Sequence, residues 1–319
     1  MITRSHILAR IMKDKVQIIS YDELKKGIDE LLLVDKWDNY KIKSSPRKFE
    51  KRLNDLFISK LGILPYVLSI MQSEDFTFPF FRLRKETNSM NNTLISEYSY
   101  PPNKVVKSIQ RANIPYHPVF YCSDNPMTAI LETVRNENKI NPKTNYYLSK
   151  WELKPKLEYR VTPFLFGNLS ESSPFKLISD DNLRKIEEVF SDYTEVEIKS
   201  IKEIMRLLSH LFIYENSYVV SSYLAHSYLY ANHNYRTDIF IYPSHQTDRK
   251  RVNFAIHPNI VTEKLKLSEV YKMNILNISE DYSKCTVNIL EIGNNNDSII
   301  FWEKFSSEKH TNEMNELVK

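Results

Sequence analysis

Glycine is unusually scarce in this chain, and its scarcity limits the nucleotide-binding folds that the sequence can adopt. Only four of the 319 residues are glycines, at Gly27, Gly62, Gly167 and Gly293. No two of them lie close enough to form the GxGxxG or GxxxxGK(S/T) loops whose backbone cradles a phosphate. A glycine-rich Rossmann loop or P-loop is therefore excluded, and any bound dinucleotide has to be held by side chains.

Length and composition indicate a globular protein of one or two domains. Hydrophobic residues make up 42% of the chain and aromatic residues 12%, enough for a substantial buried core. No apolar run approaches the roughly 18 residues of a membrane-spanning helix, and no signal-type apolar stretch follows the N-terminal basic residues. We therefore expect a cytoplasmic protein with no membrane partner. The formal net charge of +4 is modest, so nucleic acid is not an expected partner either.

Cysteine and histidine give no indication of a metal site. With only Cys122 and Cys285, the chain has neither a disulfide framework nor a cysteine-based zinc site. Cys122 is interpreted as a small buried apolar residue. The later histidines match no HExxH motif and no helical i,i+4 pair, so no metal is expected at His210, His226, His233, His245 or His257.

Periodicity divides the chain into a helical first part and a mixed second part. Residues 20–72 show helical apolar spacing in two segments separated by Ser44-Ser45-Pro46. Residues 86–104 are expected to be a long loop, and the residues after the Asn-rich tract a terminal strand or helix. Later helices are expected from Pro126 and over 181–192, 198–214 and 216–231. Strands are expected over 76–85, 117–123, 238–244, 251–257 and 284–292.

These elements predict an α+β fold. We expect a helical N-terminal domain over residues 1–75, a mixed-sheet domain over 76–292 and a C-terminal extension over 293–319.

One block combines several residue types that could act together on a ligand. The segment RANIPYHPVFYCSDNPMTAILE carries Arg111 in a loop, Tyr121 at the end of a short apolar strand and Glu132 on the next helix. Ser244 ends a later strand, IFIYPS. Taken singly, each has an ordinary explanation: a surface arginine, a core aromatic, a solvent-facing carboxylate opposite the apolar stripe of its helix, and a turn serine. Only their joint spacing favours a shared site.

That spacing resembles the RES-domain family, named for its Arg, Glu and Ser, whose members attack NAD+. Family members resemble GRWNxxGxPVVYxAxSxxxALxE, and the residues in register here are Arg111, Asn113, Pro118, Tyr121, Ala129 and Glu132. The segments SSYLAHSY, YPS and VNFAIH, which includes Asn253, resemble later parts of the family. The similarity spans roughly residues 76–270. Three positions in the loop depart from the pattern: Gln110 and Tyr116 replace its two glycines, and Ala112 replaces its tryptophan.

The resemblance implies an ADP-ribosyltransferase-like fold and cleavage of the nicotinamide–ribose bond, with NAD+ as substrate and no bound cofactor. Cleavage passes through an oxocarbenium-like transition state, which a carboxylate near the ribose stabilises. An arginine suits the pyrophosphate, a ring can stack on nicotinamide, and a hydroxyl can orient the ribose. The implied catalytic residues are Arg111, Tyr121, Glu132 and Ser244. The implied NAD+-binding residues are Asn113 and Asn253. Arg82 and Arg84 are candidates for a second phosphate contact with NAD+, although an ordinary role of an arginine at a strand end is the favoured interpretation for both.

Three functions stay open at this point. The first is an NAD+-consuming toxin or defence enzyme that uses water or phosphate as acceptor, the second transfers ADP-ribose to a protein, and the third is a catalytically silent partner-binding module. The N-terminal region resembles HEPN-like domains, whose active ribonucleases carry an Arg-x4–6-His motif. Residues 1–75 contain a single histidine, His6, which follows Arg4 by two residues and so does not match this spacing. We therefore expect it to be regulatory or to bind a partner. An antitoxin partner and a homo-oligomer are compatible with the sequence.

Overall fold

The computed structural model describes most of the chain as one mixed sheet covered by helices. The described residues are 7–10, 17–34, 37–43, 45–135, 140–167, 169–232, 236–282, 284–296 and 299–306. The helices are α1 Tyr21–Leu32, α2 Pro46–Leu61, α3 Pro126–Val134, α4 Lys176–Val189, α5 Glu195–Tyr214, α6 Val219–Leu229 and α7 Pro258–Lys264. Short 3-10 turns occur at Trp37–Tyr40, Ser73–Asp75, Ile95–Tyr98 and Asn103–Val105.

The strands of the described residues form a single sheet, in the order β1-β2-β6-β7-β8-β4-β3-β5-β9-β10-β11. Their bounds are β1 Ile7–Arg10, β2 Val67–Gln72, β3 Phe80–Lys85, β4 Phe120–Ser123, β5 Asn145–Leu153, β6 Glu158–Pro163, β7 Ile239–Pro243, β8 Val252–Ile256, β9 Leu265–Ile278, β10 Cys285–Asn296 and β11 Ile299–Lys304. Neighbouring strands are antiparallel except for β6 and β7, which are parallel. The fold is therefore α+β, as the sequence predicts.

Local sequence explains where the first two helices begin and end. The side chain of Ser20 accepts a bond from the backbone N–H of Glu23, and Glu23 caps Ser20 in return, so α1 starts with a capping box. α2 starts with a proline after the N-cap Ser45 and ends at Gly62, which has a φ of 74°. Glycine adopts this left-handed conformation without a steric penalty. Both helices confirm the prediction from periodicity.

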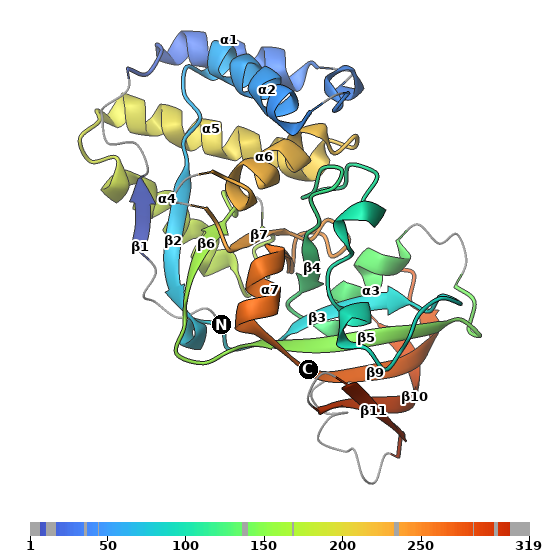
Figure 1. The fold of residues 1–319 in the computed structure, drawn as a ribbon. Coiled ribbons are helices and arrows are strands. Elements are labelled where there is room, and N and C mark those ends of the chain that lie inside the picture. Colours follow the sequence, from blue (N-terminus) through green and yellow to red (C-terminus); the bar gives the residue numbers. More distant parts are fainter. Residues whose placement is uncertain are drawn as a thin grey trace.

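The two N-terminal helices share one core with two later helices. Apolar side chains of α1 and α2 belong to the same buried cluster as those of α5 and α6. Phe57 of α2 stacks on Tyr223 of α6, with ring centroids 5.9 Å apart. α1 and α2 pack so closely that a Cβ added at Gly27 would lie 1.9 Å from the carbonyl oxygen of Lys60. These four helices form a layer at one end of the molecule, with β10 and β11 at the other (Figure 1).

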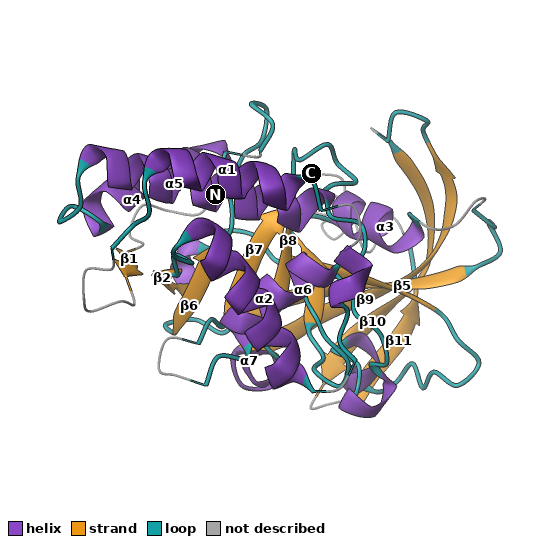
Figure 2. Cartoon of the chain, turned by 90° about the horizontal axis from the view of Figure 1, so that it is seen from above, coloured by secondary structure: helices purple, strands orange, loops and turns teal. Residues whose placement is uncertain are grey.

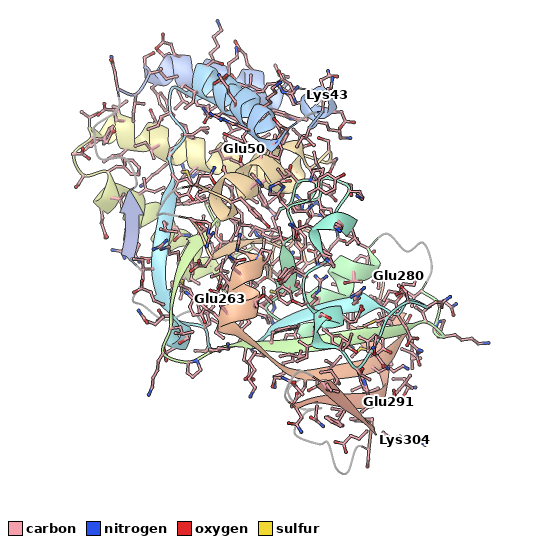
Figure 3. All side chains as sticks on the ribbon, viewed as in Figure 1. Lys43, Glu50, Glu263, Glu280, Glu291 and Lys304 are labelled. Carbon is pink, nitrogen blue, oxygen red and sulfur yellow. The ribbon has the colours of Figure 1, made fainter. Side chains whose placement is uncertain are left out.

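Charged side chains occur both in the helical layer and at the opposite end of the molecule, on β10 and β11. Glu50 of α2 lies where α2 meets α6, and its carboxylate is 2.5 Å from Nδ1 of His226 (Figure 3). Glu291 and Lys304 are register partners in β10 and β11. α4 contacts β6 and α6 contacts β7, and Figure 2 shows the helices and the sheet from above.

The sheet opens in its middle. β3 and β4 pair through a single position, Phe81 with Ser123. Beyond it β3 continues along β5, while β4 continues along β8. α3 packs across this opening, because Ala129 and Ile130 share a buried cluster with Phe81. The divergence leaves space beneath α3 that strand pairing does not fill.

Several elements differ from the sequence-based expectation. Residues 67–72 were expected to continue the helical region but form β2, since a short buried apolar run fits a strand as well as a helix. β5, β6, β9 and α7 were not predicted, and the C-terminal FWEK forms β11. The sheet also extends beyond residues 76–292, the predicted bounds of the mixed-sheet domain. β2 lies before residue 76, and β10 continues past residue 292. Arg4, His6 and residues 307–319 lie outside the described residues.

None of the described helices is both long enough and apolar enough to cross a membrane.

Candidate active site

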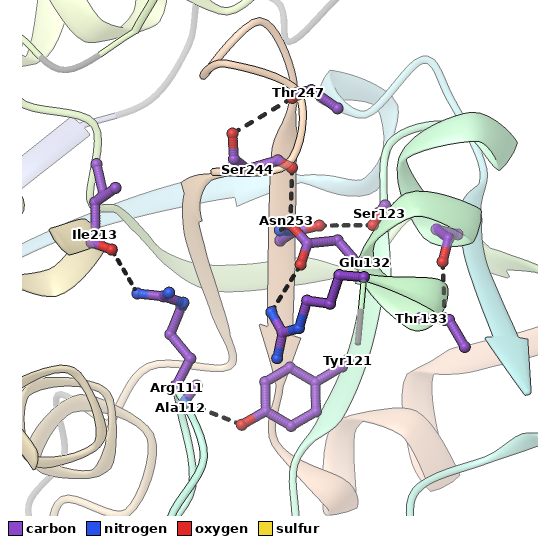
Figure 4. Close-up of polar contacts among 12 residues, drawn as sticks. Arg111, Ala112, Tyr121, Ser123, Glu132, Thr133, Ile213, Ser244, Thr247 and Asn253 are labelled. Atoms are coloured by element: carbon purple, nitrogen blue, oxygen red, sulfur yellow. Dashed lines mark hydrogen bonds and ion pairs between the residues drawn. The ribbon is translucent and has the colours of Figure 1, made fainter. Parts of the chain in front are cut away.

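Glu132 is held at the opening of the sheet by residues distant in sequence. α3 starts with Asn125, whose side-chain oxygen accepts the N–H of Thr128 at 2.8 Å, so the helix is fixed at its first turn. Oε1 of Glu132 accepts the hydroxyl of Ser244 at 2.7 Å and Nδ2 of Asn253 at 2.6 Å (Figure 4). Ser244 is 112 positions away from Glu132. The carboxylate, 20% exposed, is therefore not the freely solvated group that the residue taken alone suggested.

A short chain of hydrogen bonds fixes the direction of this carboxylate. Ser123 donates its hydroxyl to Oδ1 of Asn253 at 2.6 Å, which leaves the amide nitrogen of Asn253 pointing at Glu132. Ser244 is fully buried. Its hydroxyl binds Oε1 of Glu132, but Ser244 itself does not line the cavity that Glu132 lines. The geometry therefore favours a positioning role for Ser244 over a direct contact with a ligand.

Arg111 is held by the end of a helix. Its Nη1 donates to the carbonyl oxygens of Phe212 and, at 3.0 Å, Ile213, in the last turn of α5. Its guanidinium carbon lies 4.9 Å from the centre of the Tyr218 ring. Carbonyls in the last turn of a helix lack helical partners and carry partial negative charge, so they orient a cation well. Among the described residues these bonds use only Nη1, which leaves Nε and Nη2 for an anion.

Tyr121 and Asn113 fix the loop that carries Arg111. The backbone N–H of Ala112 donates to the hydroxyl of Tyr121 at 2.9 Å, and that hydroxyl donates to Oδ1 of Asn113 at 2.9 Å. Burial raises the pKa of Tyr121 well above its usual value, so the hydroxyl stays protonated and can donate. Nδ2 of Asn113 donates to the carbonyl of Ser108. Asn113 thus holds the loop in place, and the ring of Tyr121 lines the cavity next to it.

A cavity of about 300 Å³ lies where β3 and β4 diverge. The residues that line it include Arg82, Arg111, Tyr121, Glu132, Arg135 and Asn253. Its volume is at the lower end of the roughly 300–1,000 Å³ typical of small-molecule sites. It therefore has room for part of a dinucleotide rather than all of it.

The two arginines of β3 have different surroundings. Arg82 lines the cavity and donates from Nη1 to the carbonyl of Tyr121 at 2.9 Å, bridging the gap between β3 and β4. Its Nε is buried without a partner among the described residues, and burial lowers the pKa of Arg82 to about 10. Arg84 instead pairs with Glu97 at 2.9 Å and lines a neighbouring groove, which Arg82 also lines, but not the cavity. The structure does not bring Arg84 to Glu132.

Two further residues of this site were not predicted from the sequence. Arg135 lines the cavity and donates from Nη1 to Oε2 of Glu132 at 3.1 Å. Its i,i+3 spacing on the same helix was a readable signal. Ser123 lies two positions after Tyr121, so both side chains point to the same face of β4. That alternation was a readable signal as well.

Cysteine and histidine contribute little to the chemistry of the cavity. Burial raises the pKa of the Cys122 thiol well above its usual value, so a reactive thiolate is disfavoured. Within the part of the chain that the structure describes, no three His, Cys, Asp or Glu side chains gather in a way that could hold a metal ion. His233 lies outside the described residues.

No model of a known protein family matches this chain, and no curated protein matches it. The geometry of the cavity and the residue pattern are therefore the features that bear on function.

Proposed function

We propose that this protein cleaves the bond between nicotinamide and ribose in NAD+. The observation that carries the proposal is the arrangement around Glu132: Ser244 and Asn253 fix the carboxylate in a cavity that Arg111 and Tyr121 also line. These residue types match the needs of the reaction one by one. They come from five places in the fold, namely α3, the end of β7, β8, the loop before β4 and β4 itself, so their convergence adds information that the sequence spacing alone does not contain.

Each residue has a chemical task in this reaction. The bond between ribose C1′ and the nicotinamide nitrogen breaks, its electron pair leaves with neutral nicotinamide, and positive charge develops on the ribose. The carboxylate of Glu132 stabilises that charge and accepts a ribose hydroxyl. Ser244 and Asn253 hold Oε1 in place, so the group need not reorganise during the reaction. Arg111 grips the pyrophosphate, and the Tyr121 ring faces the nicotinamide.

The acceptor is the open part of the proposal. Water or phosphate as acceptor gives an enzyme that depletes NAD+, in keeping with a toxin or defence role and an antitoxin partner. A protein side chain as acceptor gives an ADP-ribosyltransferase, for which the same residues suffice. A silent partner-binding module, with the N-terminal helices as a HEPN-like docking part, is the alternative from another class.

Nicotinamide release from NAD+ tests the proposal. The decisive variant is Glu132→Gln, which keeps the shape of the side chain and removes its charge. Loss of electrostatic stabilisation of this kind costs about 100- to 1,000-fold in kcat. Glu203→Gln is the matched control, because Glu203 also accepts from an arginine three positions later on its helix. No release by the wild-type protein, or equal release by Glu132→Gln, would exclude this enzymatic function, and labelled NAD+ would identify the acceptor.

A further inference from the structure

Arg135 is the partner of the second carboxylate oxygen of Glu132, and both residues line the cavity. Oε1 is taken by Ser244 and Asn253, whereas Oε2 accepts from Nη1 of Arg135 at 3.1 Å. A ribose hydroxyl that approaches the carboxylate has to use Oε2. Oε2 can accept two hydrogen bonds, so Arg135 occupies one of its two acceptor positions and limits the directions from which a ribose hydroxyl can approach.

This contact can be exchanged at little cost. The bond from Arg135 to Oε2 lies on the exposed side of the carboxylate, and solvent-exposed ion pairs are weak. Arg135 is the C-cap residue of α3, and its long side chain has several rotatable bonds through which the guanidinium can turn. The other two cavity arginines are more constrained. Arg111 is bound to two carbonyls of α5, and Arg82 is bound across the gap between β3 and β4.

We infer that Arg135 is a specificity-determining residue that leaves Glu132 to bind a phosphate oxygen of the dinucleotide. The inference rests on the proposed function. A guanidinium binds phosphate through two parallel hydrogen bonds, a better match than the single bond it makes to Oε2. Substrate binding then frees Oε2 for the ribose hydroxyl. A ligand that carries phosphate uncovers the carboxylate, and a phosphate-free analogue leaves it covered.

Truncated ligands test this exchange. Nicotinamide release is measured for NAD+ and for nicotinamide riboside, which has no phosphate, with the wild-type protein, Arg135→Gln, Arg135→Lys and the control Arg206→Gln. Arg206 donates to Glu203 in an equivalent i,i+3 pair away from the cavity. We expect Arg135→Gln to raise KM for NAD+ about 10-fold or more, the effect of losing a charge-assisted hydrogen bond. Its kcat/KM for the riboside should stay constant or rise, and Arg135→Lys should lie between wild type and Arg135→Gln.

Binding of ADP-ribose, measured by calorimetry, gives an answer that does not depend on turnover. We expect about 10-fold weaker binding by Arg135→Gln and unchanged binding by Arg206→Gln. Unchanged KM and unchanged ADP-ribose affinity in Arg135→Gln would overturn the inference, as would an equal loss with both substrates. A wild-type protein that binds ADP-ribose but releases no nicotinamide would overturn the proposed function instead. If Arg135→Gln does not fold, Arg135→Lys decides, because it keeps the charge and loses the planar fork.

Discussion

Removing the hydroxyl of Ser244 should lower kcat without raising KM. The hydroxyl donates to Oε1 of Glu132 at 2.7 Å, and the residue is fully buried behind the carboxylate. A hydrogen bond to a charged group contributes about 1.5–3 kcal/mol, which corresponds to roughly 10- to 150-fold in rate. Asn253 keeps its own bond to the same oxygen, so we expect Ser244→Ala to lose about 10- to 30-fold in kcat.

The assay is nicotinamide release over a range of NAD+ concentrations. Ser221→Ala is the matched control, because Ser221 is also fully buried but its hydroxyl has no partner among the described residues. In a Glu132→Gln background the effect of Ser244→Ala should shrink, because the two residues act through one contact. A rise in KM at constant kcat would mean that Ser244 contacts the substrate directly. Such a result would refute the positioning role.

Three further predictions concern stability. Tyr121→Phe removes the hydrogen bonds to Ala112 and Asn113 and should lower the unfolding free energy, measured with denaturant, by about 1–3 kcal/mol. The control Tyr282→Phe changes an exposed tyrosine and should have little effect. Equal effects of the two substitutions would contradict the role of Tyr121 in holding the loop. Gly27→Ala should destabilise by about 1–3 kcal/mol, since its Cβ would overlap the carbonyl oxygen of Lys60, and an unchanged melting temperature would contradict the close packing of α1 and α2. Burial raises the pKa of Asp124, which pairs with Arg251, from an ordinary 3.8 to about 6. Because the folded-state pKa is the higher one, the folded protein binds this proton more tightly, and the unfolding free energy should fall by up to about 3 kcal/mol as pH rises from about 4 to about 6. The difference between wild type and Asp124→Asn should follow that slope, and a difference independent of pH would contradict it.

Local sequence signals predicted the elements that depend on neighbours in the chain. The helical spacing of α1 and α2 and the Asn125-Pro126 start of α3 have local physical causes, and the structure confirms these three helices. It also confirms the predicted helices α5 and α6. β7 and β8 were also predicted, because both runs are rich in β-branched and aromatic residues, which favour strands over helices. β2, β5 and β9 were not, since their pairing partners lie far away in the sequence and their own patterns are ambiguous.

The sequence by itself determined which chemical groups this protein can bring to a site: a carboxylate, arginines, a tyrosine and a hydroxyl, with no glycine loop for phosphate. Only the tertiary structure decided how they are used. Helical spacing alone turns Glu132 away from the apolar stripe of α3. The register of β4, β7 and β8 brings Ser123, Ser244 and Asn253 onto that face and makes the carboxylate part of a buried network. Such contacts depend on long-range strand register, which short-range patterns do not encode.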